Sequence, residues 1–218
     1  VAVPALYAAS DEMLRTLDDY VKEGGHLLIT FKSGFTNEHV KVYHDNTPHI
    51  LCNCCGVSYS EFTHPEQVSL SGFELPERDR AVSTWMELLM PEAGTEVLSR
   101  YEHPYWKDYA AVTKNHYGNG TAFYLGCRPT QAFLDQFMEL VLRDAGLYCE
   151  EKANAPVVIR ESKNEQGETI RFFLNYSMEE KTVPSLAGGR DPLNGERVPA
   201  NGAFSLHPWG CRILVADR

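Results

Sequence analysis

The first third of the chain combines two apolar runs with an amphipathic segment between them. The runs are "VAVPAL" at residues 1–6 and "HLLITF" at residues 26–31. Ser10 can cap a helix between them, and Gly24 with Gly25 would end it. Apolar residues recur through that segment at helical spacing: Met13, Leu14, Leu17, Tyr20 and Val21. The pattern predicts a strand–helix–strand unit whose strands are buried on both faces, as in a parallel sheet.

A hairpin and a second helix are predicted between residues 109 and 147. Two strand-like runs surround Gly118-Asn119-Gly120, which is a strong signal for a tight turn. The segment 128–147, "RPTQAFLDQFMELVLRDAGL", carries apolar residues at helical spacing. We therefore expect an α/β domain over residues 1–150, with a mostly parallel sheet and flanking helices.

The spacing of apolar residues changes from helical to alternating after residue 150. Short segments of strand type follow, and turn-forming pairs such as Gly188-Gly189 and Asn194-Gly195 separate them. Residues 151–218 are accordingly predicted to form a small antiparallel β-sandwich.

Charge and composition exclude two classes of partner. The 218 residues carry a formal net charge of −10 without any run of Lys or Arg, which excludes a nucleic-acid partner. No stretch approaches the roughly 18 apolar residues of a membrane helix, which excludes a membrane partner. Because the chain opens within a strand-like run and without an initiator Met, we expect it to be part of a longer polypeptide.

The six cysteines lack the spacing of a disulfide framework, which favours free thiols in a reducing cytoplasm. Cys52, Cys54 and Cys55 cluster just after His49. A structural zinc site needs four converging ligands, and no second cluster supplies them. The competing interpretation places Cys54 and Cys55, with Ile50 and Leu51, in the buried stripe of a short helix. We favour packing over a metal site, and we expect neither a metal nor a cofactor.

Two further residues occupy positions where enzymes place nucleophiles. Cys127 lies between an apolar run and a predicted helix, where amide dipoles can activate a thiolate. The glycines of a nucleophile elbow are missing, however, and no His-x-Glu pair follows as base and orienter. Ser33 also follows a strand without such an elbow, so it is predicted to cap backbone groups in a loop. No catalytic residue is assigned.

Aromatic residues and paired carboxylates offer further candidates. The segment 100–109 combines several rings with charges and a proline: Tyr101, His103, Tyr105, Trp106 and Tyr109. These rings, like Trp209, could stack on sugars, anchor a subunit contact or cover the domain's own core. The pairs Glu150-Glu151 and Glu179-Glu180 lie in linkers or turns, where carboxylates are usually solvated rather than paired for acid–base work.

The order of these landmarks resembles one known family. "VAVPALYAASDEMLRTLDDYVKEGGHLLITFKSG" and "YGNGTAFYLGCRPTQAFL" resemble segments of the trimerisation domain of the glycoside hydrolase family 42 β-galactosidases. "RFFLNYS", "DPLNGERV" and "LHPWGCRILV" are similar to the small C-terminal β domain of the same family. The resemblance covers nearly the whole chain.

The resemblance implies an amidotransferase-like (flavodoxin-like) fold over residues 1–150, without amidotransferase chemistry and without the first β-α element of that domain. It also implies a parent enzyme that hydrolyses terminal β-D-galactosides with retention, through two glutamates of a (β/α)8 barrel. Such a barrel needs about 250 residues, and all 218 residues here correspond to later domains. The implied role is a non-catalytic region that packs three subunits into a homotrimer and shapes the cleft of the barrel.

The sequence departs from the family pattern at its cysteines. "LCNCCG" replaces an apolar, Leu-rich helix end, and Cys127 replaces a usual Thr, so both changes favour buried thiols. Two other functions stay open. One is a thiol-dependent amidotransferase or peptidase that uses Cys127, and the other is a carbohydrate-binding module with Trp106 or Trp209 as its stacking platform.

Overall fold

The computed structural model describes residues 1–148, 155–185 and 187–216, and these form two compact units. The N-terminal unit is Val1–Leu147 and the C-terminal unit is Tyr148–Arg218. The domain boundary expected between residues 150 and 151 lies outside the described residues, as does the Glu150-Glu151 pair. Each unit is described by itself.

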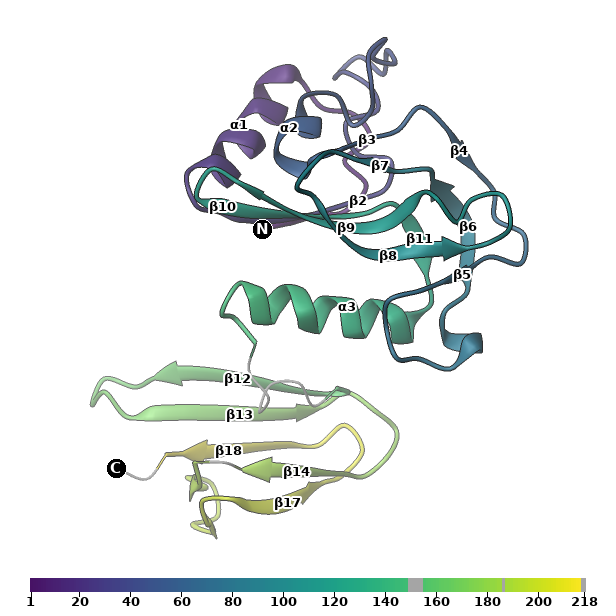
Figure 1. Cartoon of the computed structure of the whole chain (residues 1–218). Helices are drawn as coiled ribbons and strands as arrows, with labels where there is room; N and C mark the ends of the chain where they lie inside the picture. The colour runs from purple at the N-terminus through teal and green to yellow at the C-terminus, as the bar shows by residue number, and fades with distance from the viewer. Residues whose placement is uncertain (149–154, 186, 217–218) are drawn as a thin grey trace. The chain divides into compact units, whose positions relative to one another are not determined.

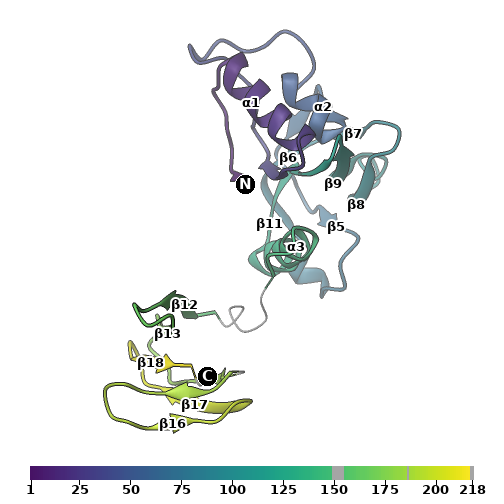
Figure 2. The same ribbon diagram turned by 90° about the vertical axis from the view of Figure 1, so that its left-hand side faces the viewer.

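A six-stranded sheet organises the N-terminal unit (Figure 1). Its strands, in spatial order, are β1 (Ala2–Val3), β2 (His26–Thr30), β10 (Gly120–Leu125), β9 (Ala110–Tyr117), β8 (Glu96–Glu102) and β5 (Ser69–Leu70). Helices α1 (Asp11–Lys22) and α2 (Cys52–Cys55) lie on one face, and α3 (Gln131–Asp144) lies on the other (Figures 1 and 2). Two hydrophobic cores result, one on each face of the sheet.

The prediction of a mostly parallel, flavodoxin-like sheet with flanking helices is wrong. Only β1–β2 and β2–β10 pair in parallel, whereas β10–β9, β9–β8 and β8–β5 are antiparallel. Between β2 and β9 the described chain forms helices of only three or four residues, together with strands that pair antiparallel, instead of further β-α units. The sequence correctly predicted the parallel strand–helix–strand unit at the start of the chain. Strands further along the chain pair antiparallel, as strands in hairpins do.

The first long helix begins at its predicted cap, Ser10, and the second begins at Thr130, a cap that the sequence analysis did not name. The Ser10 hydroxyl accepts a hydrogen bond from the backbone N–H of Met13 at 3.3 Å, and Thr130 does the same for Phe133 at 3.3 Å. Leu14 and Val21 of α1 are fully buried against the sheet. Confirmed elements are therefore the first helix, the hairpin at residues 118–120 and the helix within residues 128–147.

Short strands complete the N-terminal unit. A three-stranded antiparallel sheet runs in the order β11 (Cys127–Pro129), β6 (Val82–Glu87) and β4 (Phe62–Thr63). A second small sheet pairs β3 (Val57–Ser58) with β7 (Met90–Pro91). The 3-10 helices are η1 (His49–Leu51) and η2 (Glu77–Asp79).

The C-terminal unit pairs its strands antiparallel throughout the described residues. One sheet has the order β12 (Val157–Lys163), β13 (Thr169–Asn175), β18 (Cys211–Val215), β15 (Gly189–Arg190) and β16 (Arg197–Val198). The other pairs β14 (Lys181–Ser185) with β17 (Gly202–Leu206). Both sheets contribute to one core, in which Phe173 meets Phe204 edge-on at 5.0 Å between ring centroids.

Candidate functional site

Aromatic side chains from four separate segments of the N-terminal unit meet beyond the ends of β1 and β2. Tyr7 follows β1 and Phe35 follows β2, whereas Phe62 lies in β4 and Trp85 in β6. Successive ring centroids are 5.3 Å (Tyr7–Phe35), 5.8 Å (Phe35–Phe62) and 4.3 Å (Phe62–Trp85) apart. The ammonium group of Lys32 lies 4.0 Å from the centroid of Trp85. We call these five residues the aromatic surface.

Hydrogen bonds between two loops place the first two rings side by side. The Ser33 hydroxyl accepts from the backbone N–H of Leu6 at 3.0 Å and donates to the carbonyl of Thr30, the last residue of β2, at 2.7 Å. Gly34 has a φ of 62°, and a Cβ there would lie 2.3 Å from a backbone carbonyl oxygen. Only glycine permits this approach. The prediction that Ser33 caps backbone groups in a loop is confirmed.

The aromatic surface is partly open to solvent in the isolated chain. Tyr7 is 41% exposed, Phe62 is 43% exposed and the adjoining Val42 is 56% exposed. Lys32 and Trp85 are half-buried. Contiguous exposed apolar surface of this kind marks an interaction site, since a single exposed apolar residue needs no explanation but a connected set does.

A buried carboxylate lies directly beneath the aromatic surface. One oxygen of Glu87 accepts from the backbone N–H of Lys32 at 2.7 Å and from the indole N–H of Trp85 at 3.2 Å. Its other oxygen accepts from the Tyr124 hydroxyl at 2.9 Å. Burial raises the pKa of Glu87 to about 7, and the donors limit that rise. Glu87 therefore fixes the positions of two members of the surface from below.

Sequence reasoning missed Glu87. The signal that could have found it is a single charged residue inside the apolar run "WMELLM" at residues 85–90. A carboxylate at such a position is fully buried only when donors surround it. Trp85 supplies one donor from within the run, but the other two come from residues 32 and 124, far away in sequence, and the pattern of the run does not reveal them.

A cavity of about 220 Å³ adjoins the aromatic surface and shares Phe35 and Phe62 with it. Tyr43 also lines this cavity, and its ring stacks on His49 at 3.7 Å between centroids. The Tyr43 hydroxyl donates to Asp11 at 3.0 Å, and this hydrogen bond, more than the nearby His49, holds the pKa of Asp11 below its usual value. Burial raises the pKa of Tyr43 to about 12. The Tyr43 hydroxyl is therefore a neutral hydrogen-bond donor that links the wall of this cavity to the start of α1.

The cysteine cluster, Cys52, Cys54 and Cys55, follows His49 in the chain and is mostly buried. Cys54 and Cys55 are fully buried in the core that contains α1, with their sulfur atoms 3.9 Å apart. Burial raises the pKa of Cys52 to about 12. His49, the fourth donor considered, is occupied by Asp45 at 2.6 Å and by Asp11 at 3.3 Å. The thiols of the pair therefore act as packing groups.

Cys127 is also fully buried, and it lies within β11 rather than at a helix entrance. Burial raises the pKa of its thiol, and the neighbouring Glu87 carboxylate raises it further. A nucleophilic cysteine requires the opposite shift together with access to substrate. The structure therefore gives Cys127 a packing role opposite Met86.

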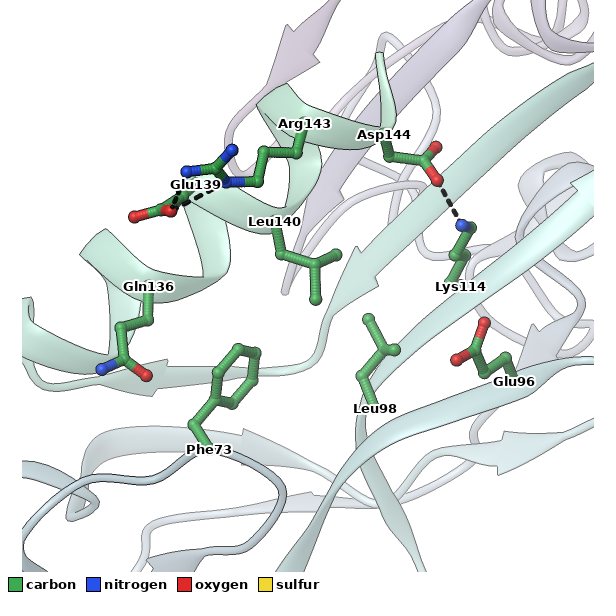
Figure 3. Close-up of a pocket in the computed structure, with 9 residues that line it drawn as sticks. All are labelled: Phe73, Glu96, Leu98, Lys114, Gln136, Glu139, Leu140, Arg143 and Asp144. Carbon is green, nitrogen blue, oxygen red and sulfur yellow. Dashed lines mark hydrogen bonds and ion pairs between the residues drawn. The ribbon is translucent and has the colours of Figure 1, made fainter. Parts of the chain in front are cut away.

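A second cavity, of about 570 Å³, lies between α3 and strands β8 and β9 (Figure 3). Phe73, Leu98 and Leu140 point into it. Charged groups on its rim pair with each other: Arg143 with Glu139 at 2.8 Å, and Lys114 with Asp144. Four of its five charged lining residues are therefore paired, whereas Glu96 forms no ion pair within the described residues.

The remaining aromatic candidates do not converge on either cavity. Trp106 is half-buried and stacks on His103 at 4.0 Å between centroids. Trp209 is 63% exposed in the C-terminal unit, where its indole N–H contacts the sulfur of Met178 at 2.9 Å. Glu179 is exposed, and its hydrogen bond with Lys181 lowers its pKa. Its neighbour Glu180 is exposed as well.

Across residues 1–148, 155–185 and 187–216, no group of three or more His, Cys, Asp or Glu side chains is arranged to hold a metal ion. None of the helices in this described part of the chain has the length and apolar character needed to span a bilayer.

Comparison with known families divides the chain in the same way as its structure. Residues 1–148 match the family model described as "Beta-galactosidase trimerisation domain", and residues 158–216 match "Beta-galactosidase C-terminal domain". The β-galactosidase LacA of Lactobacillus acidophilus is 30% identical over 220 residues, which cover 98% of this chain and 32% of that protein. LacZ of Heyndrickxia coagulans is 27% identical over 192 residues, covering 88% of this chain and 28% of that protein.

Solved structures with a similar fold include two β-galactosidases. That of Bacillus circulans sp. alkalophilus has a TM-score of 0.83 and 25% identity, and the match covers 100% of this chain and 33% of that one. A GH42 β-galactosidase from G. stearothermophilus has a TM-score of 0.84 and 24% identity, covering 100% of this chain and 31% of that one. The chain thus spans about a third of the length of the relatives that it matches.

Proposed function

The chain belongs to the glycoside hydrolase family 42 β-galactosidases, whose trimerisation and C-terminal domains it matches, and on that premise we propose that it is the non-catalytic region of an enzyme that hydrolyses terminal β-D-galactosides. The observation that carries this proposal is the order of the two matches, which together leave only a short linker unassigned. Relatives about three times as long have ample room for a catalytic barrel elsewhere.

The buried carboxylates of the chain support a scaffold role. Retaining glycosidases need two carboxyl groups about 5–5.5 Å apart in an accessible cleft. Among the residues that the structure describes, the buried carboxylates are Asp18, Glu87 and Asp191. Each has its own partners: one oxygen of Asp18 accepts from Tyr117 at 3.2 Å, and Asp191 pairs with Arg212 at 3.4 Å. All three are bound as structural groups.

Within that enzyme we assign self-association to residues 1–148. The family description of these residues names trimerisation, which supports a homotrimer. We further propose that neighbouring subunits wall the catalytic cleft. The retaining reaction itself, the galactoside substrate and a cytoplasmic location belong to the same proposal. So do the domain limits of residues 1–150 and 151–218.

The two alternative functions are not supported. A thiol-dependent amidotransferase or peptidase would need an accessible, activated Cys127, but that thiol is buried and its pKa is raised. A carbohydrate-binding module would need Trp106 or Trp209 beside a sugar-sized hollow. Trp106 instead covers its own core and stacks on His103, and Trp209 contacts Met178.

The test begins with the reading frame around this chain in its genome, where we expect a barrel that carries two strand-end glutamates. The complete enzyme should hydrolyse a chromogenic β-galactoside, and replacing either glutamate by Gln should abolish that activity. Replacing Cys127 by Ser should leave it in place. Hydrolysis by the 218-residue chain alone, or the absence of a barrel from the frame, would refute the proposal.

A further inference from the structure

We propose that the larger cavity of the N-terminal unit binds a small amphipathic amine, whose apolar body lies over Phe73, Leu98 and Leu140 and whose ammonium group lies at Glu96 (Figure 3). The cavity volume of about 570 Å³ is within the range of small-molecule sites. This site does not depend on the proposed function, because every residue that forms it belongs to the N-terminal unit described above.

Three apolar side chains form the body of the site. Phe73 lies in the loop after β5, Leu98 lies in β8 and Leu140 lies in α3, so they come from three separate segments. All three are only partly buried against the core on this face of the sheet. The Phe73 ring meets the Phe133 ring edge-on at 4.7 Å between centroids, which fixes its position. An apolar ligand group would therefore cover surface that the core leaves open.

The register of the sheet and the pairing of its charges leave one carboxylate of the cavity without a cation. Glu96 lies opposite Lys114 in the β8–β9 ladder, where opposite charges can pair across the strands. Lys114 pairs instead with Asp144 of α3, and its ammonium group lies 5.6 Å from the centroid of Phe123. The charged lining consists of three carboxylates and two cations, and within the described residues Glu96 is the carboxylate that forms no ion pair.

This arrangement determines the chemical class of the ligand. A protonated amine supplies the missing cation, whereas an anionic ligand would be repelled by the unbalanced carboxylate. Figure 3 shows Gln136 on the opposite side of the three apolar side chains from Glu96. Gln136 carries no charge, so the far end of the ligand is apolar or neutral. A monoamine therefore fits the cavity better than a diamine does.

Two other cavities have carboxylates that are already bonded. Asp45 lines the smaller cavity beside the aromatic surface, and it contacts His49 at 2.6 Å. A cavity of about 280 Å³ in the C-terminal unit is lined by Asp191 and Arg212, which pair with each other at 3.4 Å. Glu96 therefore distinguishes the larger cavity from both.

The experiment titrates the complete enzyme with three matched probes and follows binding by ligand-observed NMR. Phenylbutylamine carries the cation, phenylbutanol is its neutral counterpart and phenylpentanoate is its anionic counterpart. We expect the amine to bind about threefold tighter than the alcohol, since an ion pair with an exposed carboxylate adds a modest free energy, and the acid to bind more weakly than both. The preference for the amine should shrink in high salt. Excess galactose in every titration occupies the catalytic site assigned to the barrel.

Two variants and one control locate the binding. Glu96→Gln removes the charge and keeps the shape, so it should abolish the preference for the amine and leave the affinity for the alcohol unchanged. Leu140→Trp fills the apolar part of the cavity and should weaken the binding of both probes. The control is Glu92→Gln, which changes an exposed carboxylate outside the cavity and should keep the wild-type preference. Circular dichroism and the thermal midpoint report folding, and Glu96→Gln remains informative if Leu140→Trp does not fold.

Equal affinity for the amine and the alcohol overturns the inference, as does a preference for the amine that survives Glu96→Gln. Absence of binding by all three probes overturns it as well, because another part of the complete polypeptide then fills the cavity. Hydrolysis of a chromogenic β-galactoside, measured in separate aliquots without galactose, tests the proposed function. The failure of either one therefore leaves the other standing.

Discussion

Replacing Glu87 by Gln tests whether a buried carboxyl group makes the stability of the N-terminal unit depend on pH. Burial raises the pKa of Glu87 to about 7, compared with 4.5 for an unperturbed glutamate. In the window between these values the folded chain binds more protons at this site than the unfolded chain does. Stability from this group is therefore fully present below pH 4.5, falls as the pH rises to 7 and is constant above it.

The magnitude follows from the same two values. At about 1.4 kcal/mol for each pH unit, the difference corresponds to a loss of about 3 kcal/mol in the free energy of unfolding. The Gln side chain keeps the shape of the carboxyl group and has no such titration. The difference in unfolding free energy between Glu87→Gln and wild type should therefore change by about 3 kcal/mol in favour of the variant from pH 4.5 to pH 7.

The assay is urea unfolding at closely spaced pH values, followed by tryptophan fluorescence. A Trp209→Phe background leaves Trp85 and Trp106 as the reporters, and both lie in the N-terminal unit. Other titrating groups contribute equally to both proteins and cancel in the difference. Parallel pH profiles for the wild type and the Glu87→Gln variant would show that the carboxyl group titrates normally, and the account of its burial would then be refuted.

The remaining predictions concern thiols and one loop. Brief alkylation of the native chain, read by peptide mass spectrometry, should label the exposed Cys211 and spare the fully buried Cys127; equal labelling would contradict the packing role. Gly34→Ala should destabilise the chain by about 1–3 kcal/mol more than Gly94→Ala in thermal unfolding, because its Cβ meets the carbonyl oxygen of Pro48. Both glycines have positive φ, but a Cβ at Gly94 has no atom within 4 Å. Equal losses of stability would show that backbone strain, and not the contact with Pro48, sets the cost of Gly34→Ala.

Sequence reasoning located the candidate site only in part. It identified Ser33 as a loop residue, and its packing interpretation of Cys54 and Cys55 agrees with their burial. It directed attention to the aromatic segment 100–109, where Trp106 covers the core of its own unit. The aromatic surface went unnoticed because its members lie in four segments and each looks ordinary in its own stretch of sequence.

The sequence by itself determined the elements whose signals are local. The Ser10 cap and the helical spacing behind it specified α1, and the Gly118-Asn119-Gly120 turn specified the β9–β10 hairpin. Periodicity records which face of an element is buried, but it does not record which strand lies beside it. Only the tertiary structure decided that antiparallel strands follow the parallel start of the sheet. Only the tertiary structure, too, placed Glu87 among donors from residues 32 and 124, because long-range packing supplies hydrogen bonds that no local pattern encodes.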